Sequence, residues 1–66
     1  MPAGPVNLNT ATVAELDVLP GVGPVTAQHI LDWRNQHGRF TSVNQLNEVS
    51  GIGPAMYERL APLVTV

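Results

Sequence analysis

Two stretches decide the fold of this chain: LPGVGPVTAQHI, residues 19–30, and VSGIGPAMYERL, residues 49–60. Each residue of the second stretch lies thirty positions after its counterpart in the first, so that both contain the same corner, Gly-hydrophobic-Gly-Pro. Self-similarity at a fixed spacing is the sequence signature of a repeated supersecondary unit. The chain therefore predicts one domain that is built from two copies of a single motif.

The duplication extends upstream of both corners. Thr12 is followed three residues later by Glu15, which is the pattern of a capping box at the start of a helix. Ser42 and Gln45 repeat this pattern thirty positions further on. The pattern predicts a short helix before each corner. The duplicated segments are residues 12–30 and 42–60.

Proline and glycine mark where the other helices begin and end. Pro20 disfavours helix at Leu19 and ends the first helix there. Pro24 suits the first position of a second helix, which Gly38 ends after about His37. The corresponding limits in the second copy are Pro54 and Pro62. We expect an all-α fold of four or five short helices, followed by an apolar tail, LVTV, that packs back on the core.

Composition limits the molecule to one small domain. The chain has 66 residues, 44% of them hydrophobic, and no cysteine, so an aliphatic core must hold it together without disulfides. No apolar run approaches the roughly 18 residues of a membrane span. We expect residues 1–5 to form a disordered lead-in or linker and residues 6–66 to form the domain, with a first helix pair at 12–37 and a second at 42–61.

The charged residues argue against catalysis and against a basic surface. Three arginines and no lysine face five carboxylates, which gives a formal net charge of -2. The carboxylates are scattered, no nucleophile arrangement is visible, and His29 and His37 lack neighbouring metal ligands. The sequence predicts neither an enzyme nor a metal site. Binding of a polyanion would need donors other than a basic patch.

The repeated corner supplies such donors from the main chain. Its glycines remove the Cβ atoms that would keep another molecule from the backbone, and it leads into a helix whose first N–H groups lack intrahelical partners. With the helix dipole, this arrangement attracts anions. Glycines also serve simply to make tight turns, but their recurrence before a proline at identical phase favours phosphate binding. Two such sites on one body suit a polymer of phosphates.

These residues resemble a known family. A hydrophobic-Pro-Gly-hydrophobic-Gly-Pro corner before a helix is similar to the helix-hairpin-helix (HhH) motif, and two copies are similar to the (HhH)2 domain, a compact bundle like a SAM domain. The elements NLNTA, LPGVG and GRF, in a match over residues 6–64, resemble the C-terminal domain of the ComEA competence proteins. The resemblance implies a DNA receptor outside the cytoplasmic membrane, which binds double-stranded DNA without sequence preference during natural transformation.

The resemblance also implies which residues bind and where. In (HhH)2 domains the hairpins hold phosphates of both strands across the minor groove through backbone N–H groups, and hairpin carbonyls hold a monovalent cation beside a phosphate. The domain would be extracytoplasmic, anchored by a segment outside this sequence, and in contact with DNA, with other copies or with other competence proteins. The implied phosphate contacts are Gly21, Val22, Gly23, Val25 and Thr26, with Gly51, Ile52, Gly53, Ala55 and Met56.

The chain departs from the ComEA pattern in its charge. ComEA-like sequences commonly carry a lysine just after Gly-x-Gly, where both hairpins of this chain carry uncharged residues. The remaining cations are Arg34, Arg39 and Arg59, which we assign as auxiliary DNA contacts. His29 aligns with Arg59 in the repeat and is a further candidate to face the ligand. We expect weak binding by the isolated domain, with a Kd of about 10⁻⁴ to 10⁻⁶ M.

Two other functions fit parts of the pattern. A protein-interaction or oligomerisation module on the same scaffold would suit the acidic balance, and a targeting domain would serve a DNA-processing enzyme whose catalytic part lies elsewhere. Outside the corners we expect structural roles. These are Trp33 as a half-buried aromatic that covers the segment VNLN, Phe40 as a core residue, and Asn7, Asn9 and Thr10 as turn and cap formers.

Overall fold

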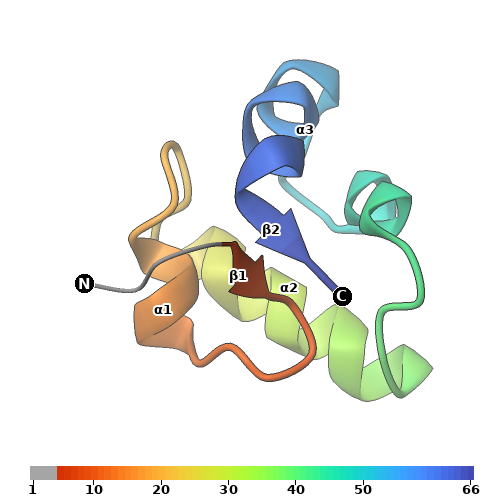
Figure 1. Ribbon diagram of the computed structural model, residues 1–66. Helices are drawn as coiled ribbons and strands as arrows, with labels where there is room; N and C mark the ends of the chain where they lie inside the picture. The colour runs from red at the N-terminus through yellow and green to blue at the C-terminus, as the bar shows by residue number, and fades with distance from the viewer. Residues whose placement is uncertain (1–4) are drawn as a thin grey trace.

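The structure of the protein is a computed structural model in which residues 5–66 are described (Figure 1). Residues 1–4 of the expected lead-in lie outside the described residues, and Pro5 is exposed and belongs to no helix or strand. The mainly helical fold is confirmed. Its elements are β1 (Val6–Asn7), α1 (Val13–Asp17), α2 (Pro24–His37), the 3-10 helix η1 (Val43–Glu48), α3 (Pro54–Leu60), the 3-10 helix η2 (Ala61–Leu63) and β2 (Val64–Thr65).

Both capping boxes are present. The hydroxyl of Thr12 accepts the N–H of Glu15 at 3.2 Å, and the Glu15 carboxylate accepts the N–H of Thr12 at 2.9 Å. Ser42 and Gln45 form the equivalent box at the start of η1. Side chains of the chain itself therefore close the N-termini of the two helices that precede the corners.

The second copy departs from the first in the type of its leading helix, because η1 is a 3-10 helix and not the expected α-helix. Its sequence, VNQLNE, contains two asparagines, whose side chains compete with the helical backbone. Ser42 Oγ accepts the N–H of Asn44, only two residues away, and Asn47 Nδ2 donates to the Asn44 carbonyl. These local bonds favour the tighter winding of a short 3-10 segment.

Glycine and proline set the limits of α2 and α3 as expected. Each helix begins with a proline that follows an extended glycine, and α2 ends at His37 before Gly38, whose φ is +88°. Gly21 and Gly51 have φ of +79° and +92°, so both corners turn through the left-handed region that residues with a Cβ rarely adopt.

A two-stranded parallel sheet joins the two ends of the described chain. Val6 is in register with Val64 and Asn7 with Thr65, and the N–H of Leu8 donates to the Thr65 carbonyl at 2.8 Å. Val64 is buried, so the apolar tail does pack back on the core. The strand pairing itself was not predicted, because strands of two residues have no detectable periodicity.

The core is aliphatic with one aromatic cluster. Its largest fully buried side chains are Leu8, Leu16, Ile30, Phe40, Leu46 and Leu60. Trp33 is only 7% exposed and stacks with Phe40 at 4.5 Å and with His37 at 4.0 Å between ring centroids. The sequence predicted a half-buried Trp33, and the structure buries it more deeply. The reason is that Trp33 packs against Phe40, which lies on the segment that links the two copies.

Candidate nucleic-acid interface

The two corners, residues 19–24 (hairpin 1) and 49–54 (hairpin 2), have the same internal construction. The N–H of Val22 donates to the Leu19 carbonyl at 3.1 Å, and the N–H of Ile52 donates to the Val49 carbonyl at 3.2 Å. The side chains of Val22 and Ile52 are 5% and 7% exposed. Val22 and Ile52 thus anchor the hairpins to the core, and their N–H groups are used inside the turn. Their assignment as phosphate contacts stays a prediction.

Hairpin 1 leaves its other amides open. Among the hydrogen bonds of residues 5–66, none is donated by the N–H groups of Gly21, Gly23, Val25 or Thr26. The first closed bond of α2 runs from the N–H of Ala27 to the Gly23 carbonyl, at 2.9 Å. Val25 is 69% exposed, and the space where a Cβ of Gly23 would lie holds no atom within 4 Å. The main chain is therefore accessible from outside.

Hairpin 2 repeats this arrangement. Within residues 5–66 the N–H groups of Gly51, Gly53, Ala55 and Met56 donate no hydrogen bond, and α3 closes its first turn from Tyr57 to the Gly53 carbonyl at 2.9 Å. No side chain caps either α2 or α3, whereas capping boxes close α1 and η1. Among α1, α2, η1 and α3, the helix starts without a side-chain cap are therefore the two at the hairpins, where both N-caps are glycines.

The hairpins contact each other's helices in a crosswise manner. A Cβ on Gly21 would lie 3.6 Å from Met56 Cε and 3.7 Å from Arg59 Nη1. A Cβ on Gly51 would lie 3.6 Å from Thr26 Oγ1 and from His29 Nδ1. The contacting residues are equivalent in the repeat: Thr26 matches Met56, and His29 matches Arg59. The two copies are therefore related by an approximate two-fold arrangement that brings both hairpins together.

One hydrogen bond fixes this arrangement at hairpin 2. His29 Nδ1 lies 2.9 Å from the Ser50 carbonyl oxygen. Because a carbonyl only accepts, Nδ1 must carry the proton of that bond. At hairpin 1 the equivalent residue, Arg59, is exposed at the surface beside Gly21. Crosswise contact was not foreseeable from the spacing, because the repeat describes each copy and not how the copies pack.

The other two arginines are placed differently. Arg34 is half-buried, and its Nη1 donates to the carbonyls of Leu8 and Ala11, both at 3.0 Å. Arg34 therefore holds the N-terminal segment on α2, and its assignment as an auxiliary DNA contact stays a prediction. Arg39 is exposed in the link between α2 and η1. It follows that Arg59 alone of the three lies against a hairpin glycine.

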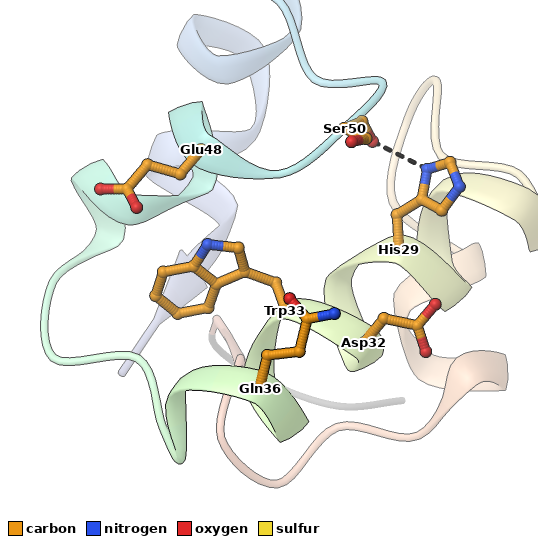
Figure 2. A pocket seen from close by; sticks show the side chains of 6 residues that line it. All are labelled: His29, Asp32, Trp33, Gln36, Glu48 and Ser50. Carbon is orange, nitrogen blue, oxygen red and sulfur yellow. Dashed lines mark hydrogen bonds between the residues drawn. The ribbon is translucent and has the colours of Figure 1, made fainter.

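An open pocket of about 230 Å³ adjoins hairpin 2 (Figure 2). It lies between α2 and the segment from η1 to hairpin 2, and the bond from His29 to Ser50 crosses its edge. Within residues 5–66 no three acidic, histidine or cysteine side chains are grouped as a metal site requires, and no helix is long and apolar enough to cross a bilayer. The residues that line the pocket beside hairpin 2 are His29, Asp32, Trp33, Gln36, Glu48 and Ser50.

Two carbonyls in the segment of hairpin 2 accept hydrogen bonds from the chain's own donors. The Val49 carbonyl accepts the N–H of Ile52, and the Ser50 carbonyl accepts Nδ1–H of His29. The binding proposed below relies on the N–H groups and cationic side chains of the chain itself.

Comparison with known proteins places the chain among proteins with the same motif. The chain is similar to ComE operon protein 1 of Bacillus subtilis, with 43% identity over 61 residues that cover 92% of this chain and 30% of that protein. It is also similar to an uncharacterized protein of Haemophilus influenzae, with 44% identity over 82% of this chain and 49% of that protein. A third relative is endonuclease/exonuclease/phosphatase family domain-containing protein 1 of Xenopus laevis, with 46% identity over 83% of this chain and 10% of that protein.

The chain thus spans less than half the length of each of these relatives. The family model described as the helix-hairpin-helix motif matches residues 2–65. That match covers nearly the whole sequence and includes both hairpins, both capping boxes and the terminal strands. The chain therefore belongs to the helix-hairpin-helix family, and its sequence is that of a ComEA-like helix-hairpin-helix domain.

Proposed function

We propose that this domain binds double-stranded DNA without sequence preference, and that the open amides of its two hairpins hold the phosphates. The observation that carries the proposal is the crosswise placement of Arg59 beside Gly21 and of His29 beside Gly51. It brings two sets of unpaired N–H groups onto one rigid body, as two phosphates of a single duplex would require. No base-reading side chain is needed for such contacts, so sequence preference is not expected.

Backbone donors supply most of the interaction. The net charge is -2, and Arg59 is the arginine in contact with a hairpin. Backbone N–H groups at a helix start carry partial positive charge and bind phosphate oxygens without a formal cation. Binding by one isolated domain is therefore weak, in the range of about 10⁻⁴ to 10⁻⁶ M. Several tethered copies would bind more strongly, because the second contact becomes intramolecular.

Titration of the isotope-labelled protein with a short duplex tests this function. The amide resonances of Gly21, Gly23, Gly51 and Gly53 should shift on addition of DNA, with equal effect for two duplexes of unrelated sequence. Resonances of the strand pair β1 and β2 provide the internal control, since these residues lie outside both hairpins and are assigned no DNA contact. Shifts that depend on protein concentration and ignore DNA would replace this proposal with self-association.

We further propose that the domain is the DNA-capturing module of a ComEA-like competence protein, displayed outside the cytoplasmic membrane. The similarity to ComE operon protein 1 supports this, and the chain corresponds to 30% of that protein's length. Protease treatment of intact cells that express the full-length protein tests the location: the domain should be digested from outside. Its survival in intact cells, with digestion only after lysis, would refute the receptor role.

The relatives named for an endonuclease/exonuclease/phosphatase domain favour a second candidate, a module that brings an enzyme to DNA. The chain covers only 10% of that relative, so the likeness concerns this domain alone. The two candidates share the same DNA contacts. They differ in the rest of the full-length protein, where an enzyme domain would support targeting and a membrane segment would support capture.

A further inference from the structure

We propose that His29 is the cationic phosphate ligand of hairpin 2 when its imidazole is protonated, as the counterpart of Arg59 at hairpin 1. The inference rests on the DNA binding proposed above. The two residues are equivalent in the repeat and contact equivalent glycines of the opposite hairpin. The domain therefore has a cation at hairpin 1 at every pH, Arg59, and a cation at hairpin 2 only when His29 is protonated.

The hydrogen bond to Ser50 decides which ring nitrogen is available. Nδ1 donates to the Ser50 carbonyl at 2.9 Å, so it keeps its proton in both charge states. The second nitrogen, Nε2, is then the atom that gains a proton, and Figure 2 shows it on the side of the ring away from Ser50. The bond thus orients the imidazole against hairpin 2 and leaves Nε2 free to act.

Protonation changes what the ring offers to an anion. Neutral imidazole presents a lone pair at Nε2, which repels a phosphate oxygen, whereas imidazolium presents an N–H donor with a full positive charge. Histidine is the side chain whose charge ordinarily changes between pH 5 and 8, while a phosphodiester stays anionic throughout that range. DNA binding and proton uptake by His29 should therefore favour each other.

The charged groups around His29 limit the size of the effect. Asp32 on α2 and Glu48 on η1 line the same pocket as His29, and both are exposed. Trp33, Gln36 and Ser50 complete the lining and carry no charge. The two carboxylates attract imidazolium as a phosphate does, so they compete with DNA for it. Because both carboxylates are exposed and the imidazole is partly exposed, we expect affinity for a duplex to rise only about three- to tenfold from pH 8 to pH 5.5.

Fluorescence anisotropy with a labelled duplex, measured from pH 8 to pH 5.5 at constant ionic strength, tests the inference. His29→Asn retains an amide donor near the position of Nδ1 but cannot be charged, and its affinity should be independent of pH. His29→Arg is charged at every pH, and its affinity at pH 8 should match that of the unsubstituted protein at pH 5.5. His37→Gln is the matched control, because His37 stacks on Trp33 and contacts neither hairpin glycine.

The outcomes separate this inference from the function on which it rests. A pH response that disappears in His29→Asn and persists in His37→Gln supports the role of His29. A full pH response in His29→Asn overturns it while DNA binding stands. If the unsubstituted protein binds no duplex at any pH, the DNA-binding function is wrong, and this role of His29 is wrong with it. Circular dichroism establishes that each variant is folded. If His29→Asn is unfolded, the duplex affinity of His29→Arg at pH 8 tests the inference in its place.

Discussion

Asn9 and Phe40, 31 positions apart, are joined by two reciprocal hydrogen bonds: Asn9 Nδ2 donates to the Phe40 carbonyl at 2.9 Å, and the Phe40 N–H donates to Asn9 Oδ1 at 2.6 Å. One side-chain amide thereby serves both backbone groups of a residue whose own side chain is fully buried. The pair ties the N-terminal segment to the link between the two copies, a connection that neither copy encodes.

Replacement of Asn9 by Ala should destabilise the fold. It leaves two backbone groups of a core residue without partners, and each such loss costs about 1–3 kcal/mol, so we expect a decrease of roughly 2–6 kcal/mol in the free energy of unfolding. Chemical denaturation followed by circular dichroism measures it. Asn35→Ala, on the exposed face of α2, is the control and should be neutral or slightly stabilising. Equal stability of the two variants would contradict the role of Asn9.

Arg34 and Arg39 should respond differently to the same substitution. Arg34→Gln removes a charged donor from two carbonyls and should lower the free energy of unfolding by about 1–3 kcal/mol. Arg39 is exposed, so Arg39→Gln should change stability by less than about 0.5 kcal/mol. Thermal unfolding of both variants at pH 7 gives the comparison. If Arg39→Gln lowered the free energy of unfolding as much as Arg34→Gln, the charge of the arginines, and not the hydrogen bonds of Arg34, would stabilise the fold.

Alanine at the hairpin glycines should separate folding from binding. Gly21→Ala and Gly51→Ala place a Cβ at positive φ, which costs about 1–2 kcal/mol of stability. Gly23→Ala and Gly53→Ala meet no atom within 4 Å and have extended backbones, so they should fold nearly as well.

The binding prediction concerns the second pair. A Cβ at Gly23 or Gly53 lies over the open main chain, and we expect duplex affinity to fall about tenfold, the equivalent of one lost hydrogen bond to a charged group. Gly38→Ala is the control, since it has positive φ but lies outside the hairpins, and it should lose stability without losing affinity. Unchanged affinity in Gly23→Ala and Gly53→Ala would place the DNA elsewhere on the protein.

The dependence of binding on salt should be shallow. With three arginines and no lysine, a plot of log K against log salt concentration at pH 8 should have a slope no steeper than about -2.7, from roughly -0.9 per neutralised phosphate. The double variant Val25→Lys and Ala55→Lys restores cations at the open helix starts, so it should bind more tightly and steepen the slope by about 1.8. A slope steeper than about -5 in the unsubstituted protein would mean that its cationic surface has been misplaced.

The helices were predictable because local chemistry specifies them. Helix starts are marked by bonds between near neighbours, Thr12 with Glu15 and Ser42 with Gln45. Pro24 begins α2 because its ring fixes a helical φ, and Gly38 ends α2 because glycine tolerates a positive φ. The unpaired N–H groups at the starts of α2 and α3 were predictable too, because a glycine N-cap has no side chain that could accept their hydrogen bonds. The assignment of the phosphate contacts stays a prediction, and within it the N–H groups of Val22 and Ile52 already donate to a turn bond inside each hairpin.

What the sequence did not reveal depends on contacts between distant segments. The pairing of β1 with β2, the two bonds between Asn9 and Phe40, and the anchoring by Arg34 leave no periodic trace, because each involves one or two residues. The repeat aligned His29 with Arg59, but the contact of each with the opposite hairpin arises from the packing of one copy on the other. Symmetry between the copies was visible in the sequence, and its geometry was not.

The parallel pairing of β1 with β2 also determines how the domain bears load. The chain enters the pair at one end of β1 and leaves it at the far end of β2, so traction through flanking residues pulls the strands lengthwise past each other (Figure 1). Bonds strained in shear resist together, whereas bonds at a peeling edge fail one after another. The resistance of this small helical body to a pull on the two ends of the strand pair thus depends on the direction of the pull.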